Sequence, residues 1–247
     1  MMLNTKGRLR AVRGMSIALL CVLAQPSFAA EHAGDIEVAA VSDVLHVDPH
    51  GQAQVAADGS KIFEADFRDF GGGLYVTDDP GFVAGDGALA GGTQIWYQGL
   101  GTLQAWNGSS WVVASSAVAV NILDVLGTYT TFSSVGVTDP VGAIAQVSGA
   151  GDIHSHLDFS ITGADRDVAS AYLITLQLTS RGNGGSLPGP YAMSDAFHIA
   201  FNNGLGEPAF ESAVGALMAP VPEPQAYALM LAGLSLLGAA MRRAKAG

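Results

Sequence analysis

The sequence predicts an all-β protein, an antiparallel β-sandwich or jelly-roll-like single domain. Short alternating or apolar runs separated by turn residues fill the body of the chain, and no stretch keeps a helical period for long. Amphipathic helices of ten or more residues, which a parallel α/β arrangement needs between its strands, are not evident. The domain is expected to span residues 30–219 and to be large enough for one ordinary hydrophobic core.

The strands are expected where such runs lie between turn signals such as Asp58-Gly59 and Asn107-Gly108. The clearest hairpin is Leu103–Val113, because two short runs flank Asn-Gly-Ser-Ser. One short helix is expected near Glu211–Met218, where apolar residues recur at helical spacing. The expected strands are Asp35–Val41, Val44–Val47, Ala53–Ala57, Lys61–Phe67, Thr93–Gln98, Thr102–Trp106, Trp111–Ala114, Ala117–Val125, Tyr129–Ser134, Ile144–Val147, Asp152–Ile161, Ala171–Thr179 and Phe197–Phe201.

The first 29 residues have the pattern of a secretory signal peptide. Four basic residues between Lys6 and Arg13 precede the apolar stretch Met15–Ala24, and small residues then allow cleavage after Ala29 or Ala30. The only cysteine of the chain, Cys21, lies inside this segment. The mature protein is therefore expected to have no disulfide and no cysteine-type zinc site.

The charge of the body argues against some classes of partner. All 22 acidic residues lie between Glu31 and Glu223, and only four basic residues lie in the same interval, so this part carries a net charge of −18 against −11 for the whole chain. Such a surface would repel the phosphates of nucleic acid. It suits an extracellular protein that attracts cations.

The C-terminal tail has three parts: Pro222-Glu223-Pro224 after Val221, the uncharged apolar run Ala226–Met241, and a basic end that includes Arg242 and Arg243. Arginines directly after an apolar run favour the cytoplasmic side of a membrane. The tail resembles the PEP-CTERM sorting signal of Gram-negative bacteria. The resemblance implies that residues 220–247 are a sorting signal with a single transmembrane helix.

The same resemblance implies a route for the protein. Export across the inner membrane, removal of the signal peptide by signal peptidase and transient anchoring in the membrane are followed by processing near the motif by an exosortase. The mature protein is then expected at the cell surface or in the extracellular matrix.

The segment Asp152–Ile161 carries the most distinctive chemistry of the body. On a single strand, Asp152, His154, His156 and Asp158 would all point to one face. Imidazole and carboxylate donors suit zinc, although a solvated outer face with two histidines has the same pattern. His32, His46, His50 and His198 are the further histidines that could complete a four-coordinate site.

Two further resemblances involve this segment. His154-Ser-His156-Leu-Asp158 fits the H-x-H-x-D pattern of metallo-β-lactamase-like hydrolases, but Phe159 stands where that family continues with histidine. His32-x-x-Asp35, Asp79–Phe82, the His-Ser-His strand and Ser194–Gly204 together resemble PEP-CTERM proteins under zinc-repressor control. This second resemblance implies a surface protein made when zinc is scarce, and by analogy gives a zinc-capturing role to His32, His154, His156 and His198.

Other patterns leave weaker options open. Asp78, Asp79 and Asp86 could bind Ca²⁺ but lack the EF-hand spacing. The cluster Trp96, Tyr97, Trp106 and Trp111 could stack on sugar rings, although such residues more often pack in the core. A serine-nucleophile elbow and a phosphate-binding loop are absent from the sequence.

The sequence therefore predicts a non-enzymatic exported protein that binds zinc or another divalent cation. The expected ligands are His154, His156 and Asp158, with His32 and His198. The alternative is a structural or adhesive matrix protein that binds extracellular polysaccharide without metal, and the third possibility is a metal-dependent hydrolase.

Overall fold

The computed structural model describes residues 34–68 and 73–218, which belong to one compact unit. These residues form sixteen strands, one short 3-10 helix and one α-helix, so the prediction of an all-β protein is confirmed. The elements are β1 Ile36–Val41, β2 Val44–Val47, β3 Gln54–Val55, β4 Lys61–Asp66, β5 Val76–Thr77, β6 Phe82–Ala84, β7 Gln94–Trp106, β8 Trp111–Val113, β9 Val118–Leu123, β10 Tyr129–Ser133, β11 Gly136–Thr138, β12 Val141–Gln146, β13 Ile153–Ser155, β14 Asp158–Gly163, β15 Ser170–Arg181, η1 Asn183–Gly185, β16 Ala196–Asn203 and α1 Glu207–Gly215.

The predicted signal peptide (residues 1–29) and sorting segment (residues 220–247) lie outside the described residues. The same holds for the sorting-motif residues Val221–Pro224, Arg242 and Arg243. Among the residues that the structure describes, no helix is long and apolar enough to cross a membrane.

The strands form three sheets that together make a β-sandwich. The largest has the order β12-β7-β15-β16-β4-β3, with β8 paired to β7; a second has the order β11-β10-β9-β14-β5, and a third the order β13-β6-β1-β2. Most neighbours are antiparallel, as expected. However, β1 pairs with β6 and β4 with β16 in parallel, so the third and the largest sheets are mixed, whereas the second is antiparallel throughout.

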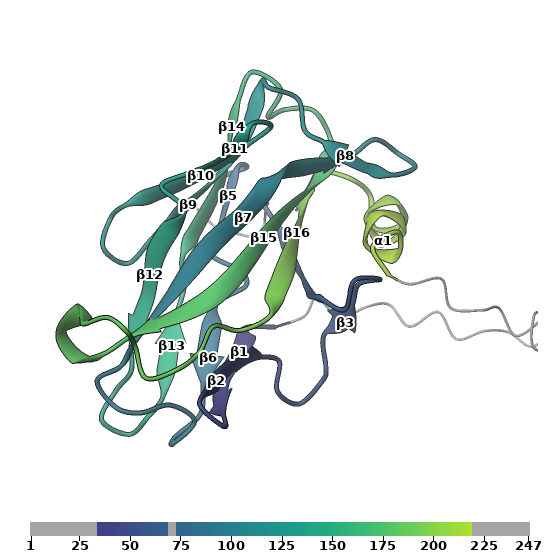
Figure 1. The fold of residues 1–247 in the computed structure, drawn as a ribbon. Helices are drawn as coiled ribbons and strands as arrows, with labels where there is room; N and C mark the ends of the chain where they lie inside the picture. The colour runs from purple at the N-terminus through teal and green to yellow at the C-terminus, as the bar shows by residue number, and fades with distance from the viewer. Residues whose placement is uncertain (1–33, 69–72, 219–247) are drawn as a thin grey trace, which may run out of the picture. The chain divides into compact units, whose positions relative to one another are not determined.

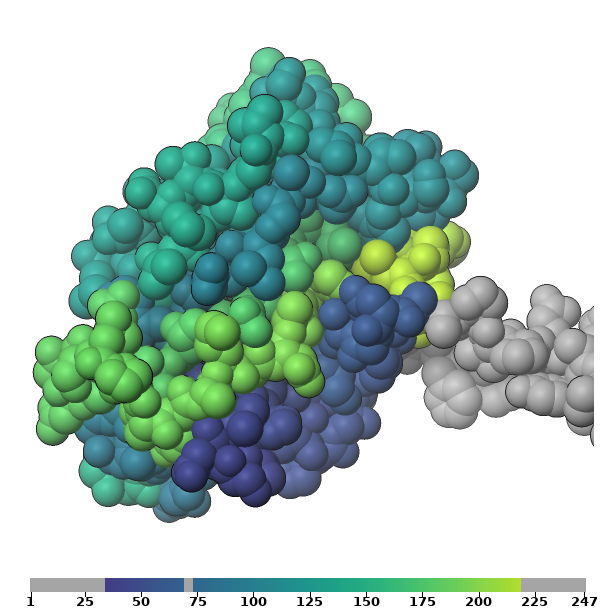
Figure 2. All heavy atoms as spheres, viewed as in Figure 1, coloured from purple at the N-terminus to yellow at the C-terminus, as the bar shows by residue number. Residues whose placement is uncertain are grey.

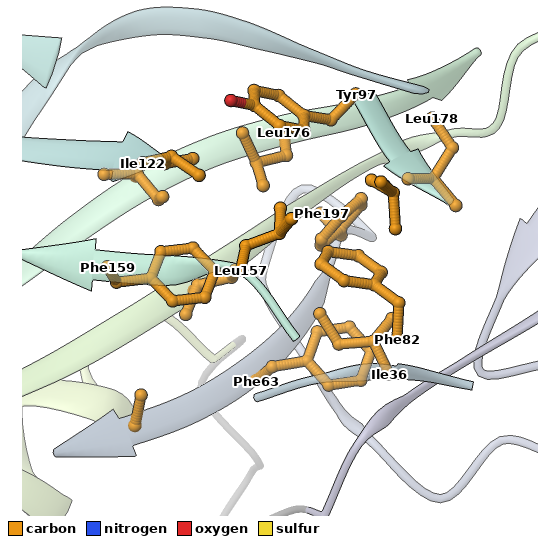
Figure 3. Close-up of a cluster of buried hydrophobic side chains, with 14 of the residues drawn as sticks. Ile36, Phe63, Phe82, Tyr97, Ile122, Leu157, Phe159, Leu176, Leu178 and Phe197 are labelled. Atoms are coloured by element: carbon orange, nitrogen blue, oxygen red, sulfur yellow. The ribbon is translucent and has the colours of Figure 1, made fainter. Parts of the chain in front are cut away.

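The core lies between the inner faces of the sheets and takes side chains from all three (Figure 3). Alternation along β9 buries Val118, Val120 and Ile122. The ring of Phe201 from the largest sheet stacks on Phe67 with a centroid separation of 4.8 Å and lies 5.2 Å from Phe159 of the second sheet. Contacts of this kind tie the layers together.

A smaller apolar cluster lies under helix α1, which runs beside β16 in Figure 1. Phe210, Ala213 and Val214 of the helix are fully buried there. The helix begins four residues earlier than the sequence predicts and ends at Gly215, with a proline in its first turn, a position that proline favours. The indole of Trp111 holds it in place, because its Nε1 donates to the carbonyl of Ala213 at 2.8 Å.

The chain beyond α1 is tied to the turn between β3 and β4. Met218 forms an isolated antiparallel bridge with Ala56, and the Ala57 amide donates to the carbonyl of Leu217 at 2.8 Å. In Figure 2 this end of the chain, in yellow, lies between the teal β7–β8 hairpin and the blue β3–β4 region.

The structure divides the strands differently from the prediction in two places. The expected strands at 93–98 and 102–106 form the single strand β7, in which Gly101 has a φ of +73° beside a shift of register against β15. The expected strand at 152–161 is two strands: Ser155 of β13 faces Phe82 of β6, whereas Asp158 of β14 faces Leu123 of β9. The chain therefore passes from one sheet to another between Ser155 and Asp158.

Candidate metal centre

The side chains of the candidate metal centre come from three segments that meet around β6. Asp35 directly precedes β1, the turn Asp78–Gly81 joins β5 to β6, and His154 and His156 lie in and just after β13. Strand β6 pairs with β1 on one side and with β13 on the other. Segments more than 100 residues apart in the sequence are thereby placed side by side.

Each functional segment is anchored by an apolar neighbour in the core. Ile36 follows Asp35, Phe82 follows Gly81 and Leu157 follows His156, and all three are at most 1 % exposed. Figure 3 shows these three side chains among the core residues. Because the neighbours are buried, the polar side chains are held at the margin of the core.

The two histidines meet through their Nε2 atoms. His154 Nε2 and His156 Nε2 are 3.1 Å apart, with ring centroids separated by 5.2 Å and planes inclined by 51°. Two nitrogens bound to one tetrahedral zinc at about 2.0–2.1 Å would be separated by about 3.3 Å. The observed spacing is therefore close to that of two ligands of one ion.

The protonation of His156 is set by the turn before β6. Its Nδ1 lies 2.9 Å from the carbonyl oxygen of Asp78. A carbonyl oxygen can only accept, so His156 carries its proton on Nδ1 and leaves the lone pair of Nε2 available. Metal-binding histidines are commonly oriented by this type of hydrogen bond from the ring nitrogen that does not bind the metal.

The carboxylate of Asp35 is the third candidate metal ligand of the group. Its Oδ1 accepts from the Gly81 amide at 3.0 Å, and its Oδ2 lies 3.7 Å from His154 Nε2. Donor atoms of Asp35, His154 and His156 all lie within 4.8 Å of one another. The backbone thus holds the carboxylate so that it faces the paired imidazoles.

Gly81 leaves the space that the group needs. A Cβ at this position would lie 2.7 Å from His156 Cε1 and 2.8 Å from both His156 Nε2 and Asp35 Oδ1. These distances are shorter than real Cβ contacts. Any other residue would therefore push against the two donor groups.

A second group shares His156. Asp78, Asp79 and His156 also have donor atoms within 4.8 Å of one another, and Asp79 Oδ1 lies 3.8 Å from His156 Nδ1. His156 Nδ1 already donates to the carbonyl oxygen of Asp78, so it is not free to bind an ion. The group of Asp35, His154 and His156 is therefore the better candidate metal site. Asp79 then acts as an outer carboxylate behind the imidazole.

The remaining predicted ligands lie elsewhere or outside the described residues. Asp158 is exposed on β14 and is in neither group. His198 lies on β16, where its Nδ1 is 3.0 Å from Thr175 Oγ1 and its Nε2 is 3.6 Å from Asp58 Oδ2. His32 falls among the residues that are not described.

The turn that contains His46 and His50 does not join the group either. His50 Nδ1 lies 2.7 Å from Glu37 Oε2, and this hydrogen bond raises the pKa of His50. Asp48 accepts from the amides of Gln52 and Ala53 and from the Lys61 ammonium, so it is fully engaged in the structure of the turn.

Sequence reasoning missed Asp35, Asp79 and Gly81 as parts of this centre. The available signal was Asp79-Pro80-Gly81-Phe82, a turn followed by a buried aromatic residue, which marks the start of a strand. The contact between Asp35 and His154 depends on the parallel pairing of β1 with β6, and no local pattern indicates that pairing.

The C-terminal tail matches a known family of sequence motifs. A family model described as the PEP-CTERM protein-sorting motif matches residues 220–244, and it confirms the resemblance of the tail. Proteins with this signal are exported, held in the membrane by it and processed by an exosortase before they reach the surface. The chain is thus supported as a PEP-CTERM exosortase substrate.

No curated protein matches the chain. The PEP-CTERM match covers only the tail, so the resemblance of the body to zinc-repressor-regulated proteins stays a prediction.

Proposed function

We propose that the protein is a non-enzymatic surface or extracellular-matrix protein that binds zinc through Asp35, His154 and His156. The observation that carries the proposal is the meeting of two imidazole Nε2 atoms at 3.1 Å, with a backbone-oriented carboxylate beside them. Two nitrogens and one oxygen form a donor set that zinc accepts, with one further position for water.

The tautomer of His156 supports a cation at this place. In the absence of metal, His154 donates its Nε2 proton to the free Nε2 of His156. For zinc to bind both Nε2 atoms, the single ring proton of neutral His154 would move from Nε2 to Nδ1, and the ion would take the position between the two nitrogens that this proton had held. Because metal ligands bind in their deprotonated form, zinc binding is expected to weaken in acid.

The exposure of the group favours binding over catalysis. Of the three ligands, the side chain of His154 is 68 % exposed, that of His156 35 % and that of Asp35 28 %. Catalytic centres usually lie in clefts that enclose most of a substrate. An open, acidic site on a body with a net charge of −18 suits the capture of a cation from solution.

The experiment is a zinc titration of the full-length chain, purified in mild detergent, against a chromogenic chelator. One equivalent of zinc is expected to bind, and the double variant His154→Ala/His156→Ala is expected to bind none at this site. The matched control is His46→Ala/His50→Ala, which removes two histidines outside the group and should leave the binding unchanged.

A pair of single variants separates the observed donor set from the predicted one. Asp35→Asn is expected to weaken zinc binding about 10- to 100-fold. Asp158→Asn and His198→Gln are expected to leave it unchanged. The proposal is wrong if the double histidine variant still binds one equivalent as tightly as the original chain.

A further inference from the structure

A cavity at the opposite end of the largest sheet from η1 is the second feature that could bind a ligand. It has a volume of about 580 Å³, within the usual range for small-molecule sites. Its walls come from the end of β7, the segment before β15 and helix α1. None of its lining residues belongs to the candidate metal centre.

One wall of the cavity is aromatic and firmly supported. The ring of Trp106 is partly exposed and lies 5.9 Å from the ring of Trp111, inclined by 56°. Trp111 is itself fixed by its hydrogen bond to Ala213. Tyr172, which is 3 % exposed, lines the cavity from β15.

The serine hydroxyls and the aspartate of the cavity leave acceptor positions for a ligand. Ser115 Oγ donates to Asp165 Oδ2 at 2.9 Å, Ser170 Oγ donates to the Trp106 carbonyl at 3.1 Å, and Ser212 Oγ donates to the Pro208 carbonyl at 2.7 Å. Each of these hydroxyl protons is thus used within the protein. Ser115 Oγ also accepts from the Ala117 amide at 3.1 Å, and the remaining lone pairs are left for a ligand. The Asp165 carboxylate offers further acceptor positions.

The charge of the cavity excludes anionic ligands. No lysine, arginine or histidine of the described chain is among its lining residues. The neighbouring Arg166 is turned away, with its guanidinium carbon 4.7 Å from the ring centroid of Tyr75. A ligand must therefore supply hydrogen-bond donors and an apolar face without bringing negative charge.

We propose that this cavity binds a neutral hexose unit of a polysaccharide, with Trp106 stacked on the sugar ring and Asp165 accepting from its hydroxyls. A pyranose carries several hydroxyl donors at its edge and a face of C–H groups that packs on an aromatic ring. Several separate acceptors suit such a ligand better than a simple cation, which would need only one carboxylate and one aromatic ring.

The test is calorimetric titration of the full-length chain with hexasaccharides of glucose, mannose and galactose, and with tetramethylammonium as the cationic probe. Saturable binding of at least one hexasaccharide with a dissociation constant below about 1 mM is expected. Asp165→Asn keeps an acceptor for Ser115 but removes the charge, and it is expected to weaken this binding about tenfold.

Variants of the aromatic wall complete the test. Trp106→Ala is expected to weaken binding about tenfold or more, and Trp106→Phe, which keeps an aromatic face and guards against unfolding, is expected to weaken it less. The matched control is Trp96→Ala, because Trp96 stacks with Arg181 elsewhere on the sheet and should not affect binding.

Three results would overturn the proposal: no hexasaccharide binds at concentrations up to about 10 mM, sugar binding persists unchanged in both Asp165→Asn and Trp106→Ala, or only tetramethylammonium binds. None of these results bears on the zinc titration, because the two sites share no residue.

Discussion

Replacing Gly81 with alanine is the most specific test of the candidate metal centre. The new Cβ would lie 2.7–2.8 Å from atoms of His156 and Asp35, whereas ordinary contacts begin at 3.4 Å. The two donor groups would therefore have to move by about 0.6–0.7 Å, although metal–ligand distances tolerate only about 0.2 Å. Displacing oriented ligands in this way typically weakens metal binding about 10- to 100-fold, or about 1.4–2.8 kcal/mol.

The assay is the same zinc competition titration, with urea unfolding of the metal-free chain as the check on folding. Gly81 does not have a positive φ, so alanine is compatible with its backbone and the unfolding free energy should change by no more than about 1 kcal/mol. Gly85→Ala is the control, because a Cβ there would meet no atom within 4 Å. Unchanged zinc affinity in Gly81→Ala, or an equal loss in Gly85→Ala, would refute the reasoning.

Three further predictions concern stability. Burial lowers the pKa of His198 from its usual 6.5, so the unfolded chain takes up this proton first as the pH falls. The free energy of unfolding should therefore decrease as the pH drops through about 6.5. Urea titrations should show a smaller decrease in His198→Gln. Asp48→Ala leaves the Lys61 ammonium and two amides without their buried acceptor and is expected to reduce the unfolding free energy by about 2–4 kcal/mol; a change below about 0.5 kcal/mol by urea titration would contradict this expectation. Trp111→Phe removes the donor to the Ala213 carbonyl and is expected to reduce the unfolding free energy by about 1 kcal/mol, with Trp96→Phe as the control.

The fold class could be predicted because alternation is a local property. In β9, for example, the buried residues occupy every second position, as the apolar pattern of Val118, Val120 and Ile122 indicates. The short strands β5, β6 and β11 lie outside the expected strands, since two or three residues are too few to show a period. The equally short β3 and β8 fall within expected strands because turn signals lie beside them. The sequence predicts separate strands at 93–98 and 102–106, but β7 is continuous, and Gly99 within it lies where the Phe132 ring leaves no room for a Cβ.

The candidate site was predicted only in part, because it depends on long-range pairing. His154 and His156 do meet, but not as members of one strand face. Their rings approach each other because the chain leaves β13 at Ser155 and changes sheets. The sequence pattern predicts Asp158 as a ligand beside the two histidines, but this residue lies on β14 in the second sheet. The carboxylate beside the imidazoles is that of Asp35.

The bridge between Met218 and Ala56 fixes the C-terminal end of the folded body, just before the sorting motif. Pro222 is only four residues beyond Met218, and an extended chain advances at most about 3.6 Å per residue, so the motif begins within about 14 Å of the bridge. Cleavage at this motif would therefore leave only a few residues between the folded body and the new carboxyl end.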